Sequence, residues 1–187
     1  TDYAVIFNYD ITAGQRGGYF YLNDYGNMFI ENRYTDFTSY YPYKTLRNAW
    51  MLSRYVPVEK IQVEFLNKWR NQDKYGEDMF VLISPLIEKF NYLFAITMAG
   101  QPLAFMDVAD LPEKAFESPD IIKTYKSIQH DFHKGIILPI GDEPSGKSWT
   151  GFQSIDVNKG FLLILREFNT DNTAEIGTWL AKGTKVE

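Results

Sequence analysis

A small set of acidic, amide and arginine side chains follows short apolar runs in this chain, and these are the residues whose types could do chemistry. They are Asp10, Asp36, Asp107 and the group Asn67, Arg70 and Asn71. In folds built of strand–helix units, reactive side chains gather at the C-terminal ends of the strands. Two carboxyl groups at such an edge suit the cleavage of a glycosidic bond, in which one protonates the leaving oxygen and the other attacks or activates water. Carboxylates after strands also cap helices and form turns.

Other chemistries find less support in the motifs. The stretch GDEPSGKS at 141–148 echoes a phosphate-binding loop, but it contains Glu and Pro and no helix is predicted behind it. The stretch GQRGG at 14–18 lacks the context of a dinucleotide site. His130 and His133 lie in the last turn of a predicted helix, a position typical of surface residues that compensate the helix dipole. With so few ligand side chains together, we expect no metal and no cofactor, and neither histidine suits a Ser–His–Asp site.

Composition and charge exclude several classes of partner. The net charge is −5 and no basic run exceeds two residues, so neither nucleic acid nor an anionic membrane is an expected partner. No apolar stretch approaches the roughly 20 residues of a membrane span. The chain has no cysteine, which excludes disulfides but selects no compartment; a secreted or periplasmic bacterial location is favoured, and a cytoplasmic one stays open. Aromatic residues make up 17%, which fits core packing and also fits a few sugar-stacking platforms.

The first two thirds of the chain alternate strand-like and helix-like segments. Pro42 and Pro119 occupy positions where a helix begins, Gly135 ends the second helix, and Pro57 prevents the first from continuing. The predicted strands are 4–7, 28–30 and 102–106, and the predicted helices are 42–55, 86–99 and 119–134. The segment 61–66 fits either class by periodicity alone. This alternation predicts a parallel α/β arrangement.

After Gly135 the pattern changes to short strands separated by turn residues, with no helix between them. The predicted strands are 136–140, 149–155, 160–168 and 176–181. This pattern of short strands and turns predicts antiparallel pairing, as in a meander or part of a sandwich. We therefore expect one unit over 1–135 and a β-rich unit over 136–187. The first residues read as a strand, so the chain looks like a piece of something larger.

Several stretches resemble one known family. The run ENRYTD at 31–36, followed by YYPYKTLRNAW at 40–50, is similar to the late barrel of glycoside hydrolase family 36, the melibiase-type α-galactosidases. In that family an aspartate at a strand end precedes a Tyr-Pro segment that opens the next helix. The resemblance continues through VEFLNKWRN at 63–71, PIGDEPSGKSWTGFQ at 139–153 and GFLLILRE at 160–167. It implies that 61–66 is a strand.

The resemblance also implies a fold, a reaction and site residues. The fold would be the C-terminal βα units of a (β/α)₈ TIM barrel, followed by antiparallel strands of a C-terminal β-sandwich-like domain. The reaction would be retaining hydrolysis of an α-galactoside or a related α-glycoside. By this likeness Asp36 is the general acid/base, while Asp10, Arg16 and Arg33 are candidates for binding the substrate.

The family's nucleophile is an aspartate in a Lys-x-Asp motif, which this chain lacks. We therefore expect the nucleophile, with the rest of the barrel as a partner, to lie upstream of Thr1, and we expect the isolated chain to be inactive. Asp10 as the nucleophile is a minority alternative. A second alternative for the whole chain is a non-catalytic carbohydrate-binding or structural module. The sugar, the linkage and the oligomeric state stay open.

Overall fold

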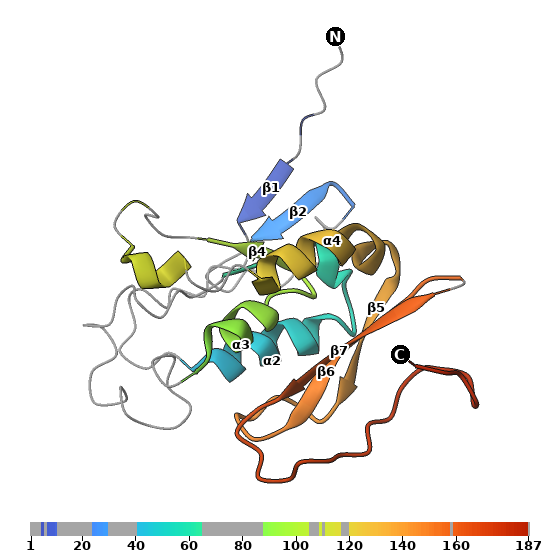
Figure 1. The fold of residues 1–187 in the computed structure, drawn as a ribbon. Coiled ribbons are helices and arrows are strands. Elements are labelled where there is room, and N and C mark those ends of the chain that lie inside the picture. The colour runs from blue at the N-terminus through green and yellow to red at the C-terminus, as the bar shows by residue number, and fades with distance from the viewer. Residues whose placement is uncertain are drawn as a thin grey trace.

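The structure, a computed structural model, describes residues 7–10, 24–29, 41–64, 88–104, 111–116, 120–157 and 159–186, with the single residues Val5 and Ala109. Two sheets lie in these ranges, a parallel one of four strands and an antiparallel one of three. Figure 1 shows helices α2 and α3 between them. The mixed α/β class predicted from the sequence is confirmed.

The parallel sheet consists of strands that neighbour one another in the order of the chain. They are β1 (Phe7–Asp10), β2 (Gly26–Phe29), β3 (Ile61–Glu64) and β4 (Gln101–Leu103). Every neighbouring pair is parallel. Of the segment 61–66, which periodicity left ambiguous, residues 61–64 form a strand, as the resemblance implied, and 65–66 lie outside the described residues. A short 3₁₀ turn (Val58–Lys60) leads into this strand.

Helix α2 (Pro42–Leu52) begins at the proline that predicted its start. Proline lacks an N–H and has its φ preset, so the first helical turn accommodates it. The buried positions recur at intervals of three and four, which gives the helix a single apolar stripe. They are Pro42, Thr45, Leu46, Ala49 and Trp50. Helix α3 (Phe90–Ala95) is shorter than the predicted 86–99, although one-turn hydrogen bonds continue beyond it to Gly100.

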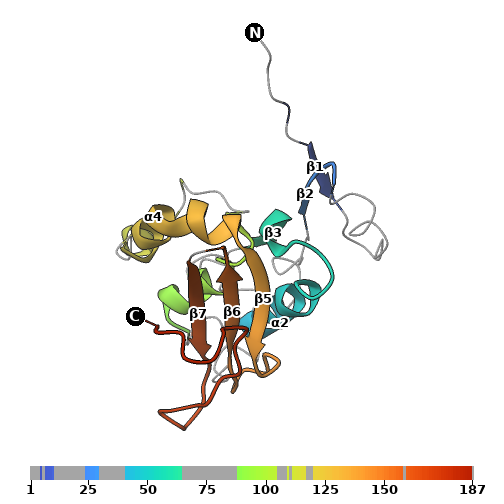
Figure 2. The ribbon, with the colours of Figure 1, turned by 90° about the vertical axis from the view of Figure 1, so that its right-hand side faces the viewer.

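Helix α4 (Asp120–Lys134) carries the predicted face and lies across the end of the second sheet (Figure 2). Tyr125 and Phe132 are buried on that face, and the preceding 3₁₀ turn (Glu113–Phe116) is also described. Gly135 follows directly. A Cβ at this position would collide with the Ser154 hydroxyl and the Ile155 carbonyl, so the close approach of the chain to the sheet requires glycine.

The antiparallel sheet contains β5 (Ile136–Gly141), β6 (Trp149–Ile155) and β7 (Gly160–Arg166), in that order. Three of the four predicted strands are therefore confirmed. The prediction of a strand at 176–181 is wrong, because these residues pair with no strand. The backbone N–H of Trp179 instead donates to the side-chain oxygen of Gln153, 2.7 Å away, as the C-terminal segment runs across the sheet.

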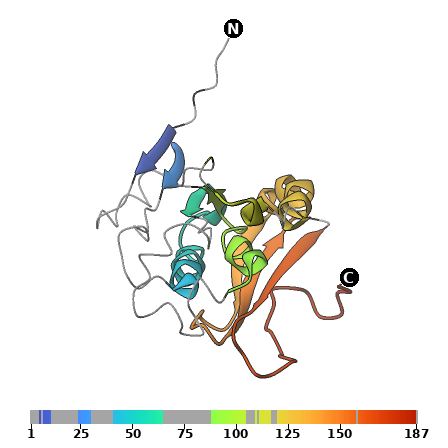
Figure 3. The same cartoon turned by 60° about the vertical axis from the view of Figure 1, so that its left-hand side comes forward.

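One apolar cluster reaches both sheets, and Figure 3 shows α2 and α3 beside both of them. It combines Met28, Ile61 and Val63 of the parallel sheet with residues of the helices and with Ile137, Phe152 and Leu165 of the antiparallel sheet. The core therefore runs across Gly135, where the sequence analysis divides the chain. The strand β1 is less covered than its prediction as a buried strand supposed, since Phe7 is 56% exposed.

A buried hydrogen bond reinforces this shared core. The indole N–H of Trp50, on α2, donates to the carbonyl of Ile140 on β5 at 3.2 Å. Trp50 itself is buried. The bond ties the helix that covers the parallel sheet to the backbone of the other sheet.

We predict that Trp50→Phe lowers the free energy of unfolding by about 1–3 kcal/mol, because the buried Ile140 carbonyl loses its donor. The midpoint of urea unfolding should fall while the slope stays unchanged. The matched control is Trp179→Phe, which removes the exposed indole bond to the Pro139 carbonyl. The free energy of unfolding of this control variant should stay within about 0.5 kcal/mol of that of the parent chain. Equal losses in the two variants would contradict a special role for Trp50.

Candidate functional site

The C-terminal ends of the parallel strands form one edge of the sheet, and Asp10 and Glu64 are the acidic residues there. Each is the last residue of its strand, β1 and β3 respectively. The register places Asp10 beside Phe29, and Phe29 beside Gln62. Because all four strands run in the same direction, their C-terminal ends share this edge.

The structure places only part of the predicted site. The backbone of Asp10 lies at the edge just described, whereas Arg16, Arg33 and Asp36 lie outside the described residues, as does Asp107. In the chain, Arg16 follows β1, Arg33 and Asp36 follow β2, and Asp107 follows β4. Whether their side chains meet stays a prediction.

The two faces of the parallel sheet differ in chemistry. Tyr9, Met28, Ile61 and Val63 pack into the helix-covered core. The alternate positions point the other way and carry amides together with Phe29 and Leu103, because successive side chains on a strand face opposite sides. Parallel strands are usually apolar on both faces. The face turned away from the helices is therefore the more polar one.

The amide side chains form hydrogen bonds that each pass over one strand. The Asn8 amide donates to the Gln62 oxygen at 2.9 Å, linking β1 to β3. The Asn27 amide donates to the Gln101 oxygen at 3.4 Å, linking β2 to β4. Gln101 in turn donates to the Glu59 carbonyl at 2.9 Å. This amide ladder orders the polar face up to the edge where Asp10 and Glu64 lie.

Glu64 is a candidate that the sequence analysis missed. It lies on the amide-bearing face at the end of β3, it is only 4% exposed, and it has an interaction partner within the chain. A buried carboxylate is costly unless it is paired or used, so such residues concentrate at functional sites. The signal was present in the sequence, since Ile61, Gln62, Val63 and Glu64 alternate apolar and polar residues.

The loop that resembles a phosphate-binding loop is filled by a carboxylate of the protein itself. Oε2 of the buried Glu167 accepts the backbone N–H groups of Ser145 and Ser148 at 3.0 and 2.8 Å. Its Oε1 accepts the hydroxyl of Tyr92, on α3, at 3.1 Å. Amide groups that could cradle a phosphate are thus engaged, which agrees with rejecting a nucleotide site here.

His133 differs from its prediction as a surface residue. It is part-buried, and its Nε2 lies 3.0 Å from the Met98 carbonyl and 3.2 Å from the Tyr125 hydroxyl. A carbonyl only accepts, so Nε2 carries the hydrogen. Burial lowers the pKa of the His133 imidazole below its ordinary value, and the Met98 carbonyl offsets part of this effect. Through its contact with the Met98 carbonyl, His133 links α4 to the backbone just after α3.

Two absences hold for the ranges that the structure describes. No three His, Cys, Asp or Glu side chains gather there as a metal-binding group would. No helix in those ranges combines the length and apolarity that crossing a bilayer requires.

No family model, no curated protein and no solved structure matches this chain.

We predict that Glu167→Gln lowers the free energy of unfolding by about 1.5–3 kcal/mol, because charge-assisted hydrogen bonds to a buried carboxylate are lost and an amide N–H₂ must face other donors. Urea unfolding measures the loss. The matched control is Glu175→Gln, at an exposed position of the C-terminal segment. A Glu167 variant as stable as this control would show that the loop does not depend on the carboxylate.

We further predict a pH dependence that comes from His133. Its pKa is lower in the folded than in the unfolded chain, so the unfolded chain takes up a proton first as the pH falls. The free energy of unfolding should therefore decrease as the pH drops below about 6.5. His133→Gln keeps a donor without titrating and should flatten this part of the profile.

The control for this prediction is His130→Gln, which removes the exposed histidine one turn earlier. Urea unfolding at a series of pH values between about 5 and 7.5 gives the stability profiles of the parent chain and of the two histidine variants. A His133→Gln profile that parallels the parent chain throughout this window would contradict the assignment.

Proposed function

We propose that this chain forms the C-terminal strand–helix units of a (β/α)₈ glycoside-hydrolase barrel, followed by a β-rich unit, and that it serves retaining hydrolysis of α-galactosides or related α-glycosides. The observation that carries the proposal is the parallel sheet in chain order, with a polar face and two carboxyl-bearing residues at its C-terminal edge. In barrels, strands neighbour one another in chain order and their C-terminal ends carry the reactive groups. Doubly wound sheets instead reverse their strand order at a switch point.

The arrangement of layers supports the same proposal. In a barrel the helices cover one face of the sheet and the other face turns inward. Here the helices pack against Met28, Ile61 and Val63, while the amides occupy the opposite face. The described strands would then be four of the eight. Carboxyl groups at their ends would meet a substrate that enters from the C-terminal edge.

Within this proposal the residues take distinct roles. Asp36, seven residues after the end of β2, is the general acid/base that protonates the leaving oxygen and then activates water. Asp10, Arg16 and Arg33 hold the sugar hydroxyls. Glu64 joins them as a further carboxyl at the same edge. The nucleophile comes from the strands that this chain does not supply, so that the two reacting carboxyls lie about 5–5.5 Å apart.

We predict a selective loss of activity for Asp36→Asn in the enzyme that contains this chain. For substrates with poor leaving groups, kcat/KM should fall by about 10²–10⁴-fold, the usual contribution of general acid–base catalysis. Activated aryl glycosides need little protonation, so their glycosylation step should be less affected. Azide needs no general base, and it should speed the second step by attacking the glycosyl-enzyme in place of water. Initial rates on paired substrates, with and without azide, give the measurement.

The matched control is Asp24→Asn, which removes an exposed aspartate just before β2 and should leave the rates unchanged. If Asp36→Asn behaves like this control, Asp36 is only a helix-capping or turn residue. The isolated 187-residue chain should show no useful turnover of a nitrophenyl α-galactoside. Turnover by this chain would instead assign the nucleophile to Asp10 or Glu64, and sugar binding without turnover in the complete protein would support a non-catalytic module.

A further inference from the structure

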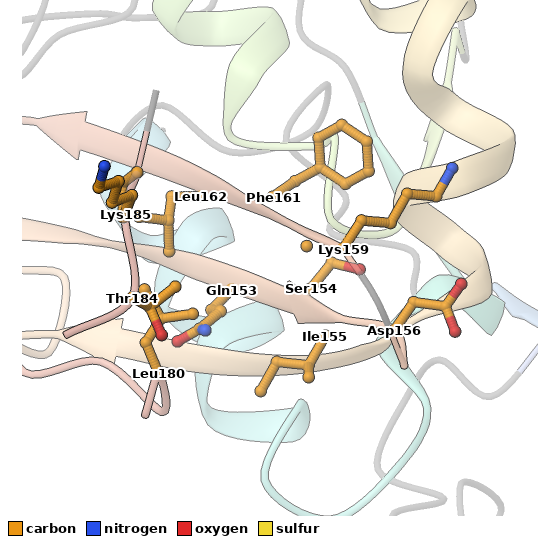
Figure 4. Close-up of a pocket in the computed structure, with 12 residues that line it drawn as sticks. Gln153, Ser154, Ile155, Asp156, Lys159, Phe161, Leu162, Leu180, Thr184 and Lys185 are labelled. Carbon is orange, nitrogen blue, oxygen red and sulfur yellow. The ribbon is translucent and has the colours of Figure 1, made fainter. Parts of the chain in front are cut away.

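A cavity of about 590 Å³ lies on the antiparallel sheet, where the C-terminal segment passes over β6 and β7 (Figure 4). Its volume falls within the range of small-molecule sites. The residues that matter for the argument are Gln153, Ile155, Leu162, Leu180, Thr184 and Lys185. The cavity belongs to the second sheet and is separate from the edge that carries Asp10 and Glu64.

Gln153 lines this cavity, and its side-chain amide holds a buried donor. Gln153 is only 1% exposed, and its Nε2 has no hydrogen-bond partner among the described residues. The orientation of the amide is fixed, because the backbone N–H of Trp179 donates to Oε1 at 2.7 Å. The nitrogen therefore cannot exchange places with the oxygen. A buried donor left unpaired costs about 1–3 kcal/mol, so this position calls for an acceptor.

The Thr184 hydroxyl supplies the complementary group. It donates to the Ala181 carbonyl at 2.8 Å, which leaves its lone pairs free to accept a hydrogen bond. Figure 4 shows Gln153, Leu162, Leu180 and Thr184 at one end of the cavity. That end thus combines a fixed donor, an acceptor and aliphatic walls.

Two of the charged residues that line the cavity form ion pairs with residues of α4. Lys159 pairs with Asp131 on α4, and Asp156 pairs with Lys134 at 3.1 Å. Lys185 is the remaining charged residue of the lining. A site whose central donor is an uncharged amide, and whose carboxylate is already paired, suits a neutral ligand better than an ion.

We propose that this cavity binds a neutral polyhydroxylated small molecule, a sugar or a polyol. A hydroxyl group both accepts and donates, so one hydroxyl accepts from Nε2 of Gln153 while it or its neighbour donates to Oγ1 of Thr184. The C–H faces of the ligand pack against Ile155, Leu162 and Leu180. The inference stands on the C-terminal sheet alone and does not rest on the proposed hydrolase.

The test follows the side-chain amide resonances of Gln153 in ¹⁵N-labelled chain during titration with galactose, glycerol and butyrate. The resonance is assigned by its loss in Gln153→Glu, which keeps an acceptor for the Trp179 N–H. Galactose, glycerol or both should shift it saturably, with a Kd of about 1–10 mM, as expected for a few hydrogen bonds in an open site. The two hydroxylic probes separate a sugar site from a general polyol site.

Variants on the C-terminal segment make the test specific. Thr184→Val should weaken binding about fivefold to tenfold, the effect of one lost hydrogen bond. Thr178→Val, on the same segment but outside the cavity, should leave it unchanged. Leu180→Trp should abolish binding by filling the space between the segment and the sheet.

Three results would overturn the proposal. One is the absence of a saturable shift with either hydroxylic probe, which would mean that water alone satisfies the amide. Another is a shift with butyrate alone, which would make the cavity an anion site centred on Lys185. The third is equal affinity in the Thr184 and Thr178 variants. Because the readout is an amide on β6, each result is independent of any glycosidase activity.

Discussion

The apolar cluster that α2 and α3 share with both sheets is the constraint on which the other features depend. Each helix has an apolar stripe that must be covered, and each sheet has one apolar face that must be covered. Placing the helices between the sheets satisfies all of these demands at once, with Phe152 and Leu165 on one side and Met28 and Ile61 on the other. The Trp50 indole bond then fixes the helix against a specific carbonyl of the second sheet.

The face of the parallel sheet that is turned away from the helices is the more polar one. The amides of Asn8, Asn27, Gln62 and Gln101 occupy that face and satisfy one another across the strands. These amides are exposed or half-buried, and the hydrogen bonds of the ladder orient them across the strands. The ladder lies next to the strand ends at Asp10 and Glu64.

The second sheet uses polar groups differently. Glu167 occupies the amide groups of its own loop and reaches Tyr92 on α3, so its charge holds the two parts of the molecule together. Gln153 shows the opposite case, since its oxygen accepts from the C-terminal segment and its buried nitrogen has no partner among the described residues. The hydrogen bonds of the Glu167 carboxylate are thus structural, whereas only the oxygen of the Gln153 amide is hydrogen-bonded among the described residues.

Local patterns in the sequence determined the elements and their class. Pro42 and Gly135 delimit helices through the geometry of the backbone itself. The change from strands alternating with helices to short strands separated by turns correctly predicted parallel and then antiparallel pairing. Tertiary structure decided what these patterns could not. It placed Glu64 and the amides on one face, buried Glu167 in its loop, drew His133 inward, and laid residues 176–181 across the sheet instead of into it. Each of these outcomes depends on a partner distant in sequence, and spacing along the chain carries no information about that partner.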